Sequence, residues 1–243
     1  MSIREGLRTY LSDQLILRTC LYLAVALGVA LLIMWPRGSL EAAVRSGATS
    51  DTFTVVAVCF LILMLLISAR FGAQDFSADP SIHIQEYVRL TPVPLLRLVS
   101  GRAAFASMHT VLLLLLGAPF LAASLAVGGA RLTHLFLGLI VIGASGLAAR
   151  SCGLLFLCIF GERRSVRDLI LSTVLVALLV TTFFVAPSSN PFRALSSLLE
   201  PASSFPEWLL STLASCAGAI CFFALSILAL RVVRAKAKGK NRG

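Results

Sequence analysis

The chain has 243 residues, of which 58% are hydrophobic and only 13% are charged, and its formal net charge is +10. A soluble domain of this length is usually about half apolar and about a quarter charged, so the composition excludes an ordinary soluble protein and indicates a lipid-embedded one. The six cysteines lie in or beside apolar runs without a CxxC pair, which argues against a disulfide framework or a metal site.

The N-terminal segment, residues 1–14, is polar and amphipathic. Ser2 and Glu5 form a capping box at a helix start, and Ile3, Leu7 and Tyr10 then fall near one face. We expect an interfacial helix that lies along the membrane surface before the first span.

Apolar runs of about 20 residues, the length that crosses a bilayer as a helix, occur six times. The predicted spans are Leu15–Trp35, Phe53–Phe71, Ala103–Val127, Leu132–Ala149, Leu169–Ala186 and Trp208–Leu230. The fourth leaves two alternatives, because apolar sequence resumes after Arg150. Either the helix is long and Arg150 extends its side chain to the interface, or the span ends there and Ser151–Phe160 lies along the surface. The sequence thus predicts an all-α, six-span protein forming a single domain, residues 1–243.

The positions of the 21 Lys and Arg residues predict the orientation of the spans. With the N-terminus inside, 17 of them fall in inner segments and only Arg37, Arg45, Arg131 and Arg193 fall in outer loops. Cytoplasmic loops of membrane proteins carry this excess, so we expect both termini inside and a multi-pass protein of the inner (plasma) membrane. The charge is then explained by topology and by the basic tail, residues 231–243, facing anionic lipid, and no nucleic-acid partner is expected.

Two segments between spans are predicted to contain short helices. The outer stretch, residues 187–207, has a helix start at Asn190-Pro191 and a stop at Pro201. The cytoplasmic loop, residues 72–102, has an N-cap at Asp79-Pro80 and a break at Thr91–Pro94, after which a helix enters the membrane. A short helix in this loop either lies on lipid or contacts another protein.

The same loop carries a motif. Its sequence EYVRLTPVP, from Glu86 to Pro94, is followed by Gly101-Arg102. This resembles the segment between the second and third spans of ABC-2 type exporter permeases, where a pattern like TLELLLxTPVS precedes Gly-Lys at the membrane entry. The Glu-to-Pro spacing, Thr-Pro-Val and the Gly-basic pair match, whereas Ile84-Gln85 and Pro94 depart from the family pattern.

In that family the loop is a coupling helix that docks on a cytoplasmic ATPase. The resemblance therefore implies an ATPase contact formed by Asp79, His83, Glu86, Tyr87, Val88, Arg89, Leu90, Thr91 and Pro92. The next cytoplasmic loop offers a second candidate contact with Glu162, Arg163, Arg164 and Arg167. Because GxxxxGK[ST] is absent from the chain, ATP and magnesium would bind to the partner ATPase, and this chain would be a transport subunit without catalytic or cofactor residues, paired with a second copy or a paralogue.

Two other classes stay open. A membrane scaffold or assembly factor would use the same basic loops to recruit a partner without transporting anything. An intramembrane protease is suggested by GASG at Gly143–Gly146, but its histidine base should follow Ser145, and His83, His109 and His134 all precede it. Small residues in this span are then explained by close helix packing. His109 in the third span either contacts substrate or protons, or bonds to a neighbouring helix.

Overall fold

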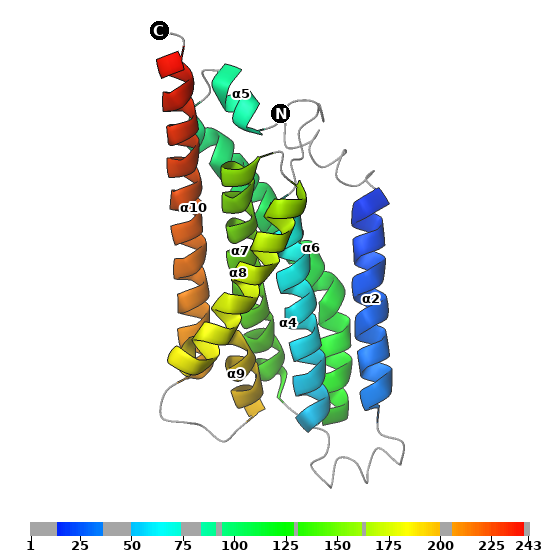
Figure 1. The fold of residues 1–243 in the computed structure, drawn as a ribbon. Helices are drawn as coiled ribbons and strands as arrows, with labels where there is room; N and C mark the ends of the chain where they lie inside the picture. The colour runs from blue at the N-terminus through cyan, green and yellow to red at the C-terminus, as the bar shows by residue number, and fades with distance from the viewer. Residues whose placement is uncertain are drawn as a thin grey trace.

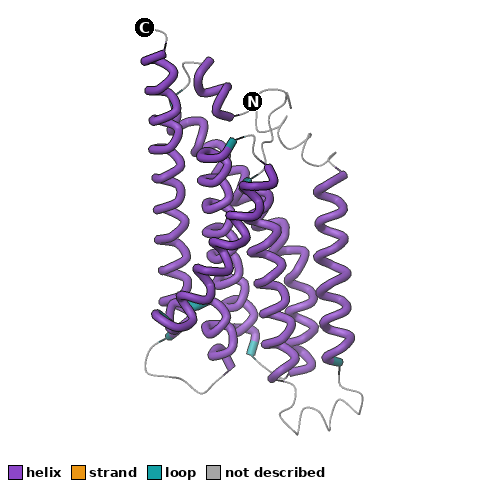
Figure 2. The backbone as a smooth tube through the Cα atoms, in the orientation of Figure 1, coloured by secondary structure: helices purple, strands orange, loops and turns teal. Residues whose placement is uncertain are grey.

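The computed structural model describes residues 14–35, 50–73, 84–90, 94–128, 131–161, 164–199 and 206–240. All regular structure in these segments is helical (Figures 1 and 2), which confirms the predicted all-α fold for this part of the chain. The long helices are α2 (Gln14–Met34), α4 (Ser50–Gly72), α6 (Leu95–Gly128), α7 (Leu132–Phe160), α8 (Arg164–Val185) and α10 (Glu207–Lys240). The short ones are α5 (Ile84–Leu90), α9 (Pro191–Ser196), and the 3-10 turns η1 (Pro187–Ser189) and η2 (Ser197–Leu199).

Six helices are long and apolar enough to cross a membrane, as the sequence predicts for a multi-pass membrane protein. The candidate spans are Ile16–Met34, Asp51–Gly72, Leu95–Val127, Leu132–Phe160, Val166–Val185 and Glu207–Lys236. Successive long helices run in opposite directions, so the start of α2, the end of α10 and the short helix α5 share one end of the bundle (Figure 1). We call this the α5 end, and the opposite end, where α9 lies, the α9 end.

Three helices extend furthest beyond their predicted spans. Helix α6 begins before Ala103, α7 continues through Arg150, and α10 continues past Leu230 into the basic tail. Because the backbone hydrogen bonds of a helix are internal, a charged residue does not end it at the membrane surface. The ends of these helices are set by local residues. Pro94 lies directly before the first residue of α6, and Gly161 ends α7 with a φ angle of 54°, a conformation that favours glycine.

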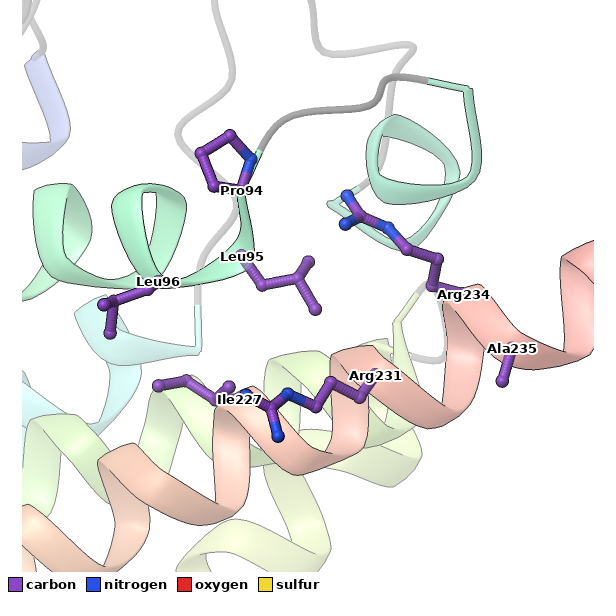
Figure 3. Close-up of a pocket in the computed structure, with 7 residues that line it drawn as sticks. All are labelled: Pro94, Leu95, Leu96, Ile227, Arg231, Arg234 and Ala235. Carbon is purple, nitrogen blue, oxygen red and sulfur yellow. The ribbon is translucent and has the colours of Figure 1, made fainter.

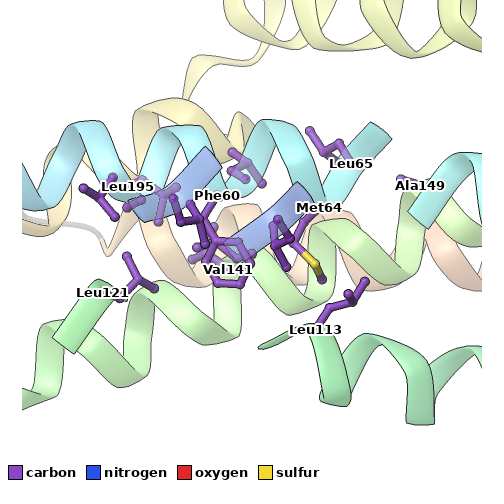
Figure 4. Packing of buried hydrophobic residues seen from close by; sticks show 14 of the residues in the cluster. Phe60, Met64, Leu65, Leu113, Leu121, Val141, Ala149 and Leu195 are labelled. Carbon is purple, nitrogen blue, oxygen red and sulfur yellow. The ribbon is translucent and has the colours of Figure 1, made fainter. Parts of the chain in front are cut away.

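Helices α4 and α7 together form the centre of the bundle: α7 packs against α4, α6, α8 and α10, and α4 packs against α2, α6 and α7. In the most apolar stretch of α4 56% of the residues are buried, against 6% in α8 and 11% in α10. Phe60 and Met64 of α4 pack with Leu113 of α6 and Val141 of α7 (Figure 4). Phe60 also lies directly on the α6 backbone, because a Cβ atom at Gly117 would sit 2.1 Å from its Cζ atom. Close packing around α4 and α7 therefore holds the bundle together.

Asn190 joins α8 to α9 at the α9 end. Its Oδ1 atom accepts hydrogen bonds from the backbone N–H groups of Phe192, at 2.9 Å, and Arg193, at 3.4 Å. Its Nδ2 group donates to the Leu179 carbonyl at 3.1 Å and to Thr182 Oγ1 at 3.0 Å. The predicted helix start at this residue is confirmed, and the same side chain also binds the last turns of α8.

Several predicted segments fall wholly or partly outside the described residues. The interfacial helix over residues 1–14 is described only at its last position, and the coupling loop only at residues 72–73, 84–90 and 94–102. The short helices expected within residues 187–207 are present as η1, α9 and η2.

Candidate functional site

The short helix α5 is fixed to the bundle by one apolar face. Ile84 and Val88, one helical turn apart, are each 2% exposed. They pack with Leu95 and Val99 of α6, Leu154, Leu157 and Cys158 of α7, and Leu230 of α10. Three long helices thus meet the inner face of α5 in one small apolar cluster.

A polar contact fixes α5 to the end of α7. The Gln85 Nε2 group donates to the carbonyl oxygens of Cys158, at 2.9 Å, and Ile159, at 3.2 Å. Carbonyl groups in the last turn of a helix lack partners within the helix, so Gln85 acts as a side-chain cap. The Gln85 amide also lies close over Gly161, where a Cβ atom would come within 3.1 Å of it.

Arg167, which belongs to the second candidate contact predicted from the sequence, reaches the same helix end. Arg167 of α8 is 4% exposed, and its Nη1 group donates to the Gly161 carbonyl at 3.1 Å. Its Nε group bonds to the neighbouring Asp168 at 3.3 Å. We call the set of Gln85, Cys158, Ile159, Gly161 and Arg167 the α7 terminal junction, because it joins α5 and α8 to the end of α7.

The structure changes the roles expected for two predicted contact residues. Val88 was expected to meet a partner, but it is buried against the chain's own bundle. Arg167 was named in the second candidate contact, and it is buried in the α7 terminal junction. In both cases the residue type suited a contact with a partner, but the sequence did not show that the chain's own helices bury the side chain.

The other predicted contact residues lie either in α5 and α8 or outside the described part of the chain. Glu86 is exposed on α5. Tyr87, Arg89 and Leu90 also lie in α5, and Arg164 is the first residue of α8. The remaining positions, outside the described residues, are Asp79, His83, Thr91, Pro92, Glu162 and Arg163.

A buried polar cluster lies where the end of α4 meets α6 and α7. Arg150 of α7 is 4% exposed and donates from Nη1 to Nδ1 of His109 on α6, which is 1% exposed. The Phe71 ring of α4 packs edge-on against His109 with centroids 4.7 Å apart, and the Arg150 Cζ atom lies 6.0 Å from the Phe71 centroid. Of the two alternatives for the fourth span, the long helix is confirmed, but Arg150 packs inside the bundle rather than extending to the interface.

Glycines bring α4 and α7 close enough to enclose this cluster. A Cβ atom at Gly72 would lie 2.1 Å from the Arg150 carbonyl oxygen, and one at Gly153 would lie 2.2 Å from that of Ala69. The two backbones are therefore in direct contact, which larger side chains would prevent. Within the described residues no carboxylate forms an ion pair with Arg150, so a neutral imidazole and an aromatic ring are its immediate neighbours.

One residue of the GASG segment, Ser145, contacts α10. The Ser145 hydroxyl of α7 lies 3.3 Å from the Ser215 hydroxyl of α10, within hydrogen-bond distance. The His109 side chain is engaged with Arg150 instead. Among the described residues, Ser145 and His109 therefore have different hydrogen-bond partners.

Comparison of the chain with protein-family models, with curated proteins and with solved structures finds no match.

Proposed function

We propose that the chain is the transmembrane subunit of an ABC-2 type exporter, driven by a separate cytoplasmic ATPase that binds ATP and magnesium. The observation that carries the proposal is the position of α5 between the second and third spans. It presents Glu86 outward while its opposite face packs on α6, α7 and α10. The motif from Glu86 to Pro94 supports the same assignment, because α5 occupies the place of the coupling helix in that family.

The contacts of α5 suit a part that transmits movement. Its apolar cluster includes residues of three spans, and Gln85 binds the last turn of α7. Close-packed interiors resist deformation, so a displacement of α5 would be passed to these helices. Helix α7 packs along α4 and carries Arg150, so the same displacement would reach the buried cluster of Arg150 and His109.

We place the α5 end in the cytoplasm. Several cationic residues lie near this end of α4, α6 and α10. Those that belong to the predicted inner segments and to the described part of the chain are Arg70, Arg97, Arg102, Arg231, Arg234 and Lys236. The described cations at the α9 end are Arg131 and Arg193, the latter paired with Glu207 at 3.2 Å. The positive-inside rule favours this orientation, in which an ATPase in the cytoplasm has access to α5.

The active assembly would contain two transmembrane subunits, either two copies of this chain or this chain and a paralogue, with two ATPase chains. ATP binding would draw the ATPases together and shift the subunits between conformations open to opposite faces.

Purification of the tagged chain from its native membrane in a mild detergent tests the proposal. We expect a nucleotide-binding polypeptide to co-purify in stoichiometric amount, with ATP hydrolysis that is lost when this polypeptide is removed. A stoichiometric partner that does not bind ATP would support the scaffold alternative instead. Hydrolysis that persists in the isolated chain would overturn the assignment as a subunit without its own ATPase.

A further inference from the structure

Gly161, the residue that ends α7, is contacted by side chains of two other helices. The Gln85 amide of α5 lies where a larger residue would carry its side chain, since a Cβ atom at Gly161 would come within 3.1 Å of that amide. Arg167 of α8 donates from Nη1 to the Gly161 carbonyl oxygen at 3.1 Å. One residue of α7 therefore has contacts with both α5 and α8.

The backbone of Gly161 is held in one orientation. Its N–H group donates to the Leu157 carbonyl at 3.0 Å, which closes the last turn of α7. Its φ and ψ angles are 54° and −114°, close to those of the first central residue of a type II′ turn, a position dominated by glycine. The ψ angle sets the direction of the carbonyl group that Arg167 binds, and the missing side chain allows the approach of Gln85. Both contacts therefore depend on the same backbone conformation.

The first turns of α8 carry its buried side chains. Arg167 and Leu171, one helical turn apart, are 4% and 3% exposed, and among the described side chains of α8 they are the buried ones. Leu171 packs in the main apolar core, and Arg167 binds Gly161. The contact with Gly161 is therefore one of the two that fix this part of α8 to the bundle.

The apolar cluster beneath α5 borders a cavity of about 510 Å³ between the start of α6 and the end of α10 (Figure 3). Leu95 belongs to both features, since it packs in the cluster with Val88 of α5 and also lines the cavity. An apolar cluster beside a cavity can be displaced with less repacking than a closed interior. A displacement of α5 therefore meets less resistance here than it would in a fully packed core.

We propose that Gly161 transmits displacements of α5 to the first turns of α8. When α5 moves away from α7, Gln85 releases the carbonyls of the last α7 turn and no longer covers Gly161. A rotation of the Gly161 peptide then turns its carbonyl away from Arg167 and loosens the start of α8. Because such coupling is reciprocal, loss of the Arg167 bond should loosen α5 in turn.

This link uses contacts within the chain alone, so it does not depend on the exporter assignment. Within that assignment, α8 is the span that responds when an ATPase moves α5. Failure of the link would leave the ATPase proposal standing, and absence of an ATPase would leave the link standing.

Hydrogen–deuterium exchange of the full chain in lipid nanodiscs tests the link in both directions. Gln85→Ala should speed exchange about threefold or more at the amides of residues 168–171, which donate the first hydrogen bonds within α8. Arg167→Met removes the donor but keeps an unbranched apolar side chain, and it should speed exchange in α5 by a similar factor. In the double variant the acceleration should be smaller than the product of the two single effects, because each change already breaks the shared contact.

Two control variants change neighbouring positions without touching Gly161. Glu86→Gln, at an exposed position of α5, should leave exchange in α8 unchanged. Ser172→Ala removes an exposed hydroxyl that bonds to the Leu169 carbonyl of the same helix at 2.9 Å, and it should leave exchange in α5 unchanged.

Unchanged exchange at residues 168–171 after Gln85→Ala would overturn the proposal, whether or not α5 itself loosens. Equal acceleration in α4 would indicate general destabilisation and would also overturn it, as would fully independent effects in the double variant. The arm with Gln85→Ala needs no change at Arg167, so the test stays decisive if Arg167→Met does not fold.

Discussion

Arg150 on α7 donates a hydrogen bond from Nη1 to Nδ1 of His109 on α6, and both side chains are buried. Because Nδ1 accepts this bond from a charged donor, the imidazole holds its proton on Nε2. The pair joins two spans through a hydrogen bond between buried polar groups. Each partner therefore depends on the other for compensation of its buried polar surface.

Replacement of His109 by Leu should destabilise the protein by about 3 kcal/mol, because it leaves the Arg150 charge buried without its hydrogen-bond acceptor. Adding Arg150→Met to this variant removes the stranded charge, and the double variant should recover most of the loss. The measurement is reversible unfolding in detergent. A cost for His109→Leu that is under about 0.5 kcal/mol would show that Arg150 does not rely on this contact.

Gly153→Ala should destabilise the bundle by about 2 kcal/mol or more, because the added methyl group meets the Ala69 carbonyl oxygen at 2.2 Å and pushes α4 from α7. The matched control is Gly218→Ala on α10, where a Cβ atom meets nothing within 4 Å. That substitution should be neutral or stabilising by up to about 1 kcal/mol, since alanine favours helix. Similar unfolding temperatures for the two variants would contradict the direct backbone contact.

Gln85→Ala should loosen α5 without unfolding the bundle. The loss of its bonds to Cys158 and Ile159 removes about 1–2 kcal/mol of local stabilisation. Hydrogen–deuterium exchange of the α5 amides should then be about tenfold faster, while exchange in α4 stays unchanged. The control is Glu86→Gln, at an exposed neighbouring position, which should exchange like the unmodified chain. Unchanged exchange in both variants would mean that the apolar face alone holds α5.

The double variant Glu86→Arg/Tyr87→Ala should lose the ATPase expected at α5. It reverses an exposed charge and removes an aromatic side chain, for a loss of association of about 2–4 kcal/mol. Co-purification from the native membrane measures the effect, with Ser196→Ala at the α9 end as the control. The chain should still insert, because neither residue lies in a span. Unchanged amounts of ATPase would exclude α5 as its docking site.

Cysteine labelling tests the orientation. In a background without native cysteines, Ser196→Cys at the α9 end should react with a membrane-impermeant maleimide from outside the intact cell. Lys236→Cys at the α5 end should react only after the membrane is permeabilised. The charge distribution is the reason for this expectation. The reverse labelling pattern would place α5 away from the cytoplasm and rule out the exporter proposal.

Much of the fold could be predicted because hydropathy and helix stops are local signals. The six spans follow from apolar runs of sufficient length, and the separation of α5 from α6 follows from the break ending at Pro94. Asn190 marked the start of α9 in the same way. These features depend on the residues near them in the chain, so a single sequence is enough to find them.

Contacts between helices could not be predicted in the same way. Gly143 and Gly146 were expected to allow close packing, and they do approach Leu114 and Met64, but the direct backbone contacts are at Gly72 and Gly153. A stripe of small residues does not show which helix it faces. For the same reason the sequence could not show that Val88 packs inward on α5.

Helix α8 is held at its two ends and little between them. Arg167 binds the end of α7 at one end, and Asn190 binds the other through Leu179 and Thr182. Only 6% of the residues in its most apolar stretch are buried. Movement along the helix axis would break both sets of hydrogen bonds, whereas sideways bending of its middle would disturb only a few apolar contacts. Lateral bowing of α8 is therefore an easier deformation of this helix than a shift along its axis.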